Sequence, residues 1–188
     1  MPKLIAINGC PGTGKTTLGE ALAKQLGFPH LDLDAYYWDL SIFHKHAEYP
    51  FQEMRPKEEI IERLANDMTK HPHFVMSGSI GSILWDFTKP YIDLAVLLFA
   101  PTAVCLERAK ARAFDRFGER VLPGGDLYNK HLELYQTIEA YEAGTNPSLS
   151  LGRHETWAAE LTCPVLRADG TKPIPENVEL IAGHYKGA

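Results

Sequence analysis

The residues with the clearest chemical signature lie close to the start of this 188-residue chain. The pattern G-x-x-x-x-G-K-[ST] is matched in full by residues 9–16, GCPGTGKT. Glycines allow backbone N–H groups to turn inward and approach a phosphate closely. Lys15 would add a positive charge for the β- and γ-phosphates, and Thr16 a hydroxyl for Mg²⁺. Because a strand-like run precedes the pattern and a helix-like run follows it, we predict a phosphate-binding loop.

A second chemical signature is the pair of carboxylates at Asp32 and Asp34. Residues 28–33 alternate apolar and polar side chains and predict a strand, on which residues two apart share a face. Both carboxylates would then point to one place beside the phosphate-binding loop. One could hold Mg²⁺ or its waters and the other could accept a proton from a hydroxyl. The alternative is that one of them caps the next segment.

The elements that must position these residues alternate between strands and helices. Strands are predicted at residues 3–8, 28–33, 73–77, 93–99 and 164–167, and helices follow from about 18, 56, 102, 126, 153 and 175. This order predicts an α/β domain with about five parallel strands and helices on both faces. Two inserts, residues 34–54 and 116–125, interrupt the alternation of strands and helices and are expected to be functional loops.

The loop sequence resembles that of P-loop NTPases of the small-molecule kinase branch, which includes adenylate, shikimate and gluconate kinases. The resemblance implies a three-layer P-loop NTPase fold over one domain, residues 1–188, with a helical lid insertion. It implies ATP and Mg²⁺ as cofactors and a loop at residues 168–173, including Gly170, beside the adenine. The residues it implies for nucleotide binding are Gly9, Gly12, Thr13, Gly14, Lys15, Thr16, Thr17 and Gly170.

The two acids look like the Asp-x-Asp of shikimate kinase-like enzymes. That likeness implies that Asp32, with Thr16, lies on the metal side and that Asp34 is the acceptor-side base. Many P-loop proteins carry an Asp after the third strand, where this chain has Ser77. Shikimate kinases carry glycines there, which implies that Gly78 lets substrate approach the backbone. A simple turn is the alternative for residues 77–79.

Four arginines recur every fourth residue and so stack on one face of a predicted helix. A basic segment punctuated by glycines at 118, 124 and 125 resembles the kinase lid, here residues 116–125. The resemblance implies that Arg116 and Arg120 stabilise the transferred phosphoryl group. Arg108 and Arg112 are expected to be solvated or ion-paired. A solvated basic helix face is the alternative for the whole set.

The insert at 34–54 is the predicted acceptor-binding region. Its aromatic side chains either stack on a flat substrate or form a small core under the loop, which we slightly favour; they are Tyr36, Tyr37, Trp38, Phe43, Tyr49 and Phe51. Arg55 and Arg153 could form a modest anion clamp, and relatives place a substrate-binding arginine near Arg153. Because arginines are otherwise scarce between residues 28 and 100, we expect a hydroxyl-bearing acceptor, with or without one carboxylate, rather than a phosphorylated one.

Composition narrows the class of protein further. Lys and Arg total 19 against 24 Asp and Glu, and this net charge of −5 argues against a nucleic-acid partner. The longest apolar run, 94–100, is too short to span a membrane. Three widely spaced cysteines indicate reduced thiols and a cytoplasmic location.

The sequence therefore predicts an ATP- and Mg²⁺-dependent kinase acting on a small hydroxyl-bearing metabolite. Two alternatives remain open at this point. One is a nucleotide-binding regulatory ATPase without a small-molecule acceptor, and the other is a nucleoside or nucleotide kinase.

Overall fold

The chain is built around a five-stranded parallel sheet with the strand order β2-β3-β1-β4-β5. A computed structural model describes residues 1–40, 49, 51, 53–80, 82–146 and 149–186. The strands are β1 (Lys3–Gly9), β2 (His30–Asp32), β3 (His73–Ser77), β4 (Ile92–Phe99) and β5 (Val165–Asp169). β1 is the central strand and pairs with β3 on one side and β4 on the other. Its carboxyl end therefore lies in the middle of the row formed by the carboxyl ends of the five strands.

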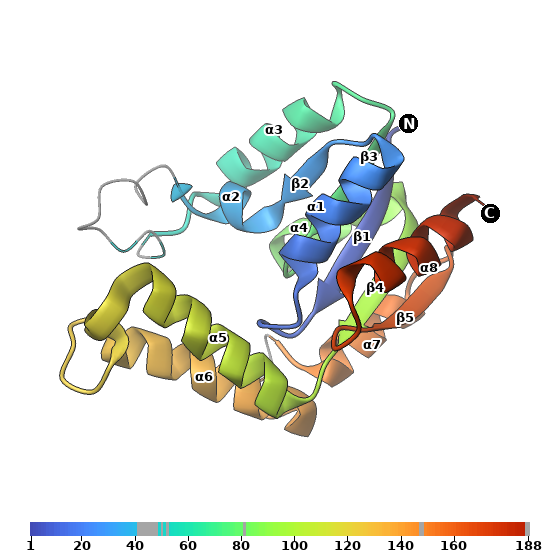
Figure 1. Cartoon of the computed structure of the whole chain (residues 1–188). Coiled ribbons are helices and arrows are strands. Elements are labelled where there is room, and N and C mark those ends of the chain that lie inside the picture. Colours follow the sequence, from blue (N-terminus) through green and yellow to red (C-terminus); the bar gives the residue numbers. More distant parts are fainter. Residues whose placement is uncertain (41–48, 50, 52, 81, 147–148, 187–188) are drawn as a thin grey trace.

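Helices cover both faces of the sheet, as Figure 1 shows. α1 (Lys15–Leu26) and α8 (Ile174–Lys186) pack side by side on one face. α3 (Lys57–Met68), α4 (Ser82–Thr88) and α7 (Leu151–Ala159) contribute to the core on the other. Side chains of β1 alternate between the two cores, because successive residues of a strand point to opposite faces. Ile5 and Ile7 pack with α1 and α8, and Leu4 and Ala6 with α3 and α4.

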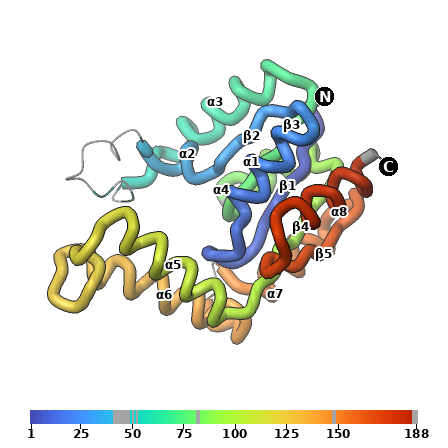
Figure 2. The backbone as a smooth tube through the Cα atoms, viewed as in Figure 1, coloured from blue at the N-terminus to red at the C-terminus, as the bar shows by residue number. Residues whose placement is uncertain are grey.

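A helical hairpin extends from the carboxyl edge of the sheet, seen at the lower left of Figure 2. It consists of α5 (Thr102–Phe117), the 3₁₀ turn η3 (Gly118–Val121) and α6 (Tyr128–Ala143). Its base is held by a buried cluster that includes Cys10 of the phosphate-binding loop and Cys105 of α5. Its tip is held by Ala113, Val121 and Leu127. The hairpin is thus anchored at one end to the loop itself.

The three-layer fold and all five strands are confirmed, with differences at particular ends. β2 has only three residues, because Asp32 caps a short helix, α2 (Leu33–Tyr37), where a loop was expected. α4 and a 3₁₀ turn, η2 (Lys89–Tyr91), lie between β3 and β4 and were not predicted. The predicted lid, 116–125, begins inside α5 and forms the tip of the hairpin.

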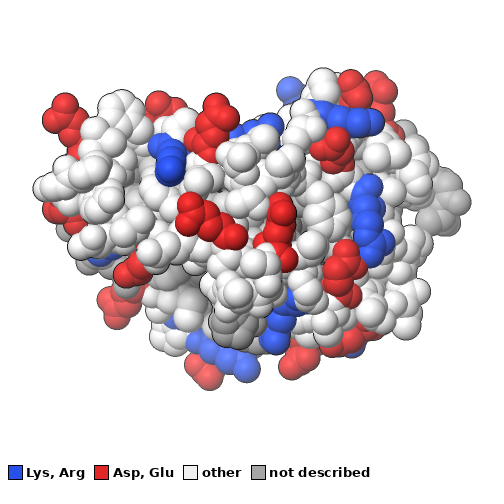
Figure 3. Space-filling model, turned by 90° about the horizontal axis from the view of Figure 1, so that it is seen from below, with Lys and Arg blue, Asp and Glu red and all other residues white. Residues whose placement is uncertain are grey.

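No helix among the described residues combines the length and apolarity needed to cross a membrane. Figure 3 shows the face below the view of Figure 1, where acidic and basic side chains are interspersed. This visible face offers no continuous basic surface of the kind that tracks a phosphate backbone.

His154 of α7 gives the core a dependence on pH. Its side chain is buried, and its Nδ1 shares a 2.7 Å hydrogen bond with the Tyr141 hydroxyl of α6. Burial, reinforced by the charge of Lys15, lowers the pKa of His154 to about 4. In the unfolded chain this histidine has an ordinary pKa near 6.5. At pH values between about 4 and 6.5 the imidazole is therefore protonated in the unfolded chain but neutral in the folded one.

We expect this difference to remove about 3 kcal/mol of unfolding free energy as the pH falls from 7 to 4. The double variant Tyr141→Phe/His154→Phe, which removes both partners of the hydrogen bond, should show a flatter profile over that range. Urea denaturation at a series of pH values measures both. Equal slopes in the two proteins would contradict a buried neutral His154.

Candidate active site

The phosphate-binding loop joins β1 to α1 and is shaped by close contacts that only glycine permits. A Cβ atom on Gly9 would lie 2.3 Å from the carbonyl oxygen of Leu98 in β4. One on Gly12 would lie 2.3 Å from the carbonyl oxygen of Cys105 in α5. Both glycines also have positive φ angles, +156° and +91°. The loop is therefore pressed between β4 and α5, and its path cannot accept side chains at these two positions.

Inside the loop, two side chains converge on one carbonyl oxygen. The Lys15 Nζ donates to the Cys10 oxygen at 2.9 Å, and the Thr13 hydroxyl donates to the same oxygen at 2.8 Å. Lys15 and Thr13 are both buried. Burial lowers the pKa of Lys15, and the nearby Asp34 carboxylate partly opposes this effect. The ammonium group is thus held within the loop, next to the amino end of α1, where a phosphate is favoured.

A cavity of about 550 Å³ opens beside this loop and gathers most of the predicted site. Its walls come from the loop, the amino ends of α1 and α2, the end of β3 and the inner side of the hairpin. Predicted residues that line it are Gly12, Gly14, Lys15, Thr16, Thr17, Asp32, Asp34, Gly78 and Arg116. The tertiary structure therefore brings the anion-binding loop, both acids and one lid arginine around a single space.

The two acids reach this cavity by a route different from the predicted one. Asp34 lies in α2, so the expectation that it shares a strand face with Asp32 is wrong. The Asp32 side chain accepts the backbone N–H of Asp34 at 3.1 Å, which is the capping role left open as the alternative. Burial, together with the Asp34 carboxylate, raises the pKa of Asp32 to about 6. Both carboxylates line the cavity nevertheless.

The end of β3 has no acid, and Ser77 does not supply a free hydroxyl in its place. Ser77 is fully buried, and its Oγ lies 2.8 Å from Nε2 of His30. Among the described residues there is no group of three or more His, Cys, Asp or Glu side chains arranged to hold a metal ion. Thr16 and Asp32 are among the oxygen-bearing side chains that line the cavity next to the loop. Hydroxyl and carboxylate oxygens suit Mg²⁺, whose other ligands are water and phosphate.

The four evenly spaced arginines have different surroundings. Arg108 donates to the carbonyl oxygen of Gly170 at 2.9 Å and, more weakly, to that of Thr13. Arg112 and Arg116 line the cavity. Arg108 and Arg112 are exposed to solvent, as predicted, although Arg108 also binds two carbonyl oxygens and Arg112 faces the cavity. Burial, with the charge of Arg112, lowers the pKa of Arg116, while Asp34 and Asp32 raise it.

Arg120 lies outside this cavity, contrary to its predicted role. Its guanidinium makes a double contact with the Asp126 carboxylate, at 2.9 and 2.6 Å, across the tip of the hairpin. The reason is that α5 ends at Phe117, so the four-residue spacing no longer keeps Arg120 on the face of Arg112 and Arg116. Arg120 therefore closes the hairpin turn.

A matched pair of variants tests this distinction between two lid arginines. We expect Arg116→Ala to lower kcat by a factor of about 100, the usual effect of removing one charged donor from a phosphoryl-transfer site. Arg120→Ala should leave kcat within about twofold, because its side chain pairs with Asp126 instead. Steady-state rates of ADP formation measure both variants. A larger loss in Arg120→Ala than in Arg116→Ala would reverse the assignment.

The other two predicted substrate arginines, Arg55 and Arg153, are likewise engaged elsewhere. Arg55 Nη1 donates to the carbonyl oxygens of Ala35, Tyr36 and Trp38 at the end of α2. Arg153 lies over the ring of Trp157, one turn along α7, at 5.1 Å from its centre. Neither lines the cavity. The structure therefore does not bring these two guanidinium groups together at the cavity, and each contacts local structure instead.

The predicted adenine loop does lie beside the phosphate-binding loop. Gly170 accepts the Arg108 hydrogen bond and lines a shallower space of about 460 Å³ with Thr13, Gly14 and Thr17. A Cβ atom on Gly170 would come within 2.7 Å of the Thr13 carbonyl oxygen. This contact explains why the smallest residue follows β5.

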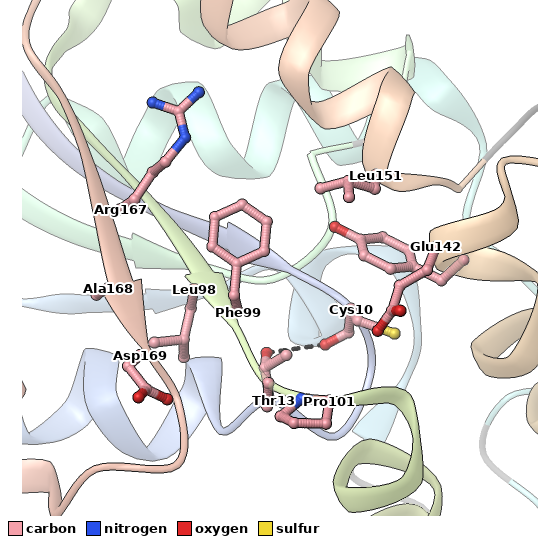
Figure 4. Close-up of a pocket in the computed structure, with 12 residues that line it drawn as sticks. Cys10, Thr13, Leu98, Phe99, Pro101, Glu142, Leu151, Arg167, Ala168 and Asp169 are labelled. Atoms are coloured by element: carbon pink, nitrogen blue, oxygen red, sulfur yellow. Dashed lines mark hydrogen bonds between the residues drawn. The ribbon is translucent and has the colours of Figure 1, made fainter.

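A larger cavity, about 690 Å³, lies near the carboxyl ends of β4 and β5 and is drawn in Figure 4. Its charged side chains already have partners. Arg167 pairs with Glu155, Glu142 accepts from the Thr102 hydroxyl, and Asp169 accepts from Thr171. Figure 4 also shows the Thr13 hydroxyl turned toward the Cys10 carbonyl oxygen. We therefore assign the chemistry to the smaller cavity, which holds Lys15 and both acids.

Sequence reasoning missed several residues of that cavity. Tyr36 and Tyr37 are buried in the core as we favoured, but Trp38, Tyr49 and Phe51 face the cavity; Phe43 lies outside the described residues. His131 of α6 is also part of the wall. The available signal was its place in the apolar stripe Leu127, His131, Leu134, Ile138, where a polar residue is unusual.

Comparison with known proteins decides the family. A family model described as an AAA domain matches residues 5–117, which is more than half of the chain and includes the loop, both acids and all of α5. The chain belongs to the AAA domain family. Over 182 residues it is 36% identical to the uncharacterized protein YqaC of Bacillus subtilis (strain 168), with 96% of each chain covered.

Two further likenesses of this AAA-domain protein are to named kinases. It is 29% identical over 139 residues to a cytidylate kinase of Roseiflexus castenholzii (strain DSM 13941 / HLO8), covering 67% of this chain but only 58% of that kinase. The fold matches a shikimate kinase structure from Bacteroides thetaiotaomicron with a TM-score of 0.59 at 19% identity, covering 98% of both chains. The prediction of a P-loop NTPase of the small-molecule kinase branch, a phosphotransferase, is confirmed.

Proposed function

We propose that this protein transfers the γ-phosphoryl group of ATP to a hydroxyl group of a small molecule in a Mg²⁺-dependent reaction. The observation that carries the proposal is the convergence of Lys15, Asp34 and Arg116 on one cavity next to the phosphate-binding loop. A cation on each side of the transferred group and a carboxylate facing it are the parts that phosphoryl transfer requires.

Each side chain has a separable role in this scheme. The loop amides and Lys15 hold the β- and γ-phosphates, and Arg112 and Arg116 approach them from α5. Thr16 and Asp32 would hold Mg²⁺, which when bound neutralises charge on the phosphates. Asp34 accepts the proton of the attacking hydroxyl. The hydroxyl oxygen then forms the new bond to phosphorus while the bond between phosphorus and the ADP oxygen breaks.

The surroundings of Asp32 support the metal role. Burial beside a second carboxylate raises the pKa of Asp32 to about 6, which means that a negative charge there lacks compensation within the protein. A divalent cation would supply that compensation. The Arg108–Gly170 contact fixes the loop after β5 against the phosphate-binding loop. This contact supports the space lined by Gly170 and Thr13 as the binding site of the purine.

The test is ADP formation from MgATP with and without candidate hydroxyl acceptors, followed by mass detection of the phosphorylated product. We expect at least one acceptor to stimulate ADP formation and to gain a phosphoryl group. Slow ADP formation that no acceptor stimulates would instead favour the regulatory ATPase. Removal of Mg²⁺ by EDTA should abolish the reaction in the first case.

A further inference from the structure

The imidazole of His131 is an unusual polar group among the described residues. It is only 5% exposed, yet neither Nδ1 nor Nε2 has a hydrogen-bond partner among the described residues. Buried polar groups are almost always paired, because an unmade hydrogen bond is costly. His131 also lines the cavity that holds Lys15 and Asp34. Its unmade hydrogen bonds make the imidazole a candidate partner for a molecule in that cavity.

His131 stands at the end of a continuous row of aromatic rings, here called the aromatic wall: Trp38, Phe51, Tyr49 and Phe117. Neighbouring ring centres are 5.9, 5.4 and 5.6 Å apart along this row. The His131 ring lies 5.7 Å from Tyr49 and 5.5 Å from Phe117. A wall of this kind favours a flat ring over an open-chain polyol, because aromatic faces and edges gain most from contact with another ring.

The charges of the cavity favour an acceptor without charge. Its described basic side chains are Lys15, Arg112 and Arg116, which the proposed function assigns to the triphosphate, and its acidic ones are Glu20, Asp32 and Asp34. No other lysine or arginine is among the described lining residues, and Lys130, which is not one of them, stands over the Tyr49 ring at 4.7 Å from its centre. Burial and the charge of Arg112 lower the pKa of His131, so its imidazole is neutral near pH 7.

We propose that His131 binds the phosphoryl acceptor directly, and that this acceptor is an uncharged, ring-bearing alcohol whose polar edge hydrogen-bonds the imidazole while its ring packs on the aromatic wall. This inference rests on the proposed function for its reaction, but binding at His131 can be tested without turnover. A neutral imidazole offers one donor and one acceptor, so it can pair with a hydroxyl, an amide or a ring nitrogen.

The first experiment compares uncharged ring alcohols with anions as acceptors. The uncharged probes are adenosine, cytidine and pyridoxine, and the anions are AMP, CMP, shikimate and gluconate. We expect ADP formation to be stimulated by an uncharged probe more strongly than by any of the anions. Preference for an anion would overturn the charge argument even though it would support the proposed kinase function.

The second experiment separates binding by His131 from a structural role. With the accepted probe, His131→Phe should raise the acceptor KM by about tenfold, the effect of one lost hydrogen bond of ordinary strength. The KM for ATP should stay within about twofold, and His131→Gln should recover part of the loss. His184→Phe, on the exposed face of α8, is the matched control. An unchanged acceptor KM in His131→Phe would overturn the proposal.

The third experiment is independent of catalysis. In proton NMR, the His131 ring signal is identified by its absence in His131→Phe, and each probe is added at millimolar concentration with a non-hydrolysable ATP analogue and Mg²⁺. A shift with uncharged ring alcohols and none with the anions supports the proposal. No shift with any probe overturns it and indicates that water alone pairs with the imidazole. Failure of turnover with a persisting shift would reject the kinase function alone.

Discussion

Replacement of Lys15 by methionine is expected to lower kcat/KM for ATP by a factor of about 1,000 without destabilising the fold. The Nζ of Lys15 is buried within the phosphate-binding loop, where it donates a hydrogen bond to the Cys10 carbonyl oxygen. Burial lowers the pKa of Lys15, which means that the charged ammonium group is less favourable there than in water. A bound triphosphate would stabilise this charge. Methionine has a similar length but no charge.

The measurement pairs steady-state ADP formation with thermal denaturation. Because Lys15→Met removes a buried charge, the Tm should stay unchanged or rise. Lys24→Met, in the exposed last turn of the same helix, serves as the control and should behave as the parent protein. Turnover of Lys15→Met within about tenfold of the parent would show that the loop does not hold the reacting phosphates.

Asp34→Asn is expected to give the other large effect. Its kcat should fall by roughly two to four orders of magnitude, which is the usual range for a lost general base. The Asp34 carboxylate lines the cavity and acts electrostatically on both Lys15 and Arg116. The amide keeps the size of the side chain but cannot accept the hydroxyl proton. The KM for ATP should change little, because the phosphates are held by other groups.

Asp32→Asn separates the two acids. We expect this variant to need a higher Mg²⁺ concentration for half-maximal rate, whereas Asp34→Asn should keep the Mg²⁺ requirement of the parent. Asp93→Asn, at the far end of β4, is a control of the same chemistry outside the cavity. Identical Mg²⁺ and kcat responses in the two cavity variants would contradict the division of roles.

The phosphate-binding loop and the order of strands could be predicted because their signals are local. Eight consecutive residues contain the glycines and the lysine that the loop needs, and the backbone supplies the rest. Continuous apolar runs likewise identify buried parallel strands whatever surrounds them. The three-layer fold follows from these features.

The destinations of long polar side chains could not be predicted in the same way. Arg108, Arg112, Arg116 and Arg120 share one spacing, yet one holds a loop, two line the cavity and one closes a turn. The outcome depends on where α5 docks and on its end at Phe117, and neither is encoded in the spacing of the arginines.

The amino-acid sequence alone was sufficient to identify the loop at residues 9–16, since its signal lies in consecutive residues. Tertiary structure alone decided the rest of the cavity, where α2, Tyr49, Phe51 and the hairpin meet. His131 and Trp38, for example, are 93 positions apart in the chain. Only packing brings such residues to one cavity, because contacts at that separation depend on the whole fold rather than on any local pattern.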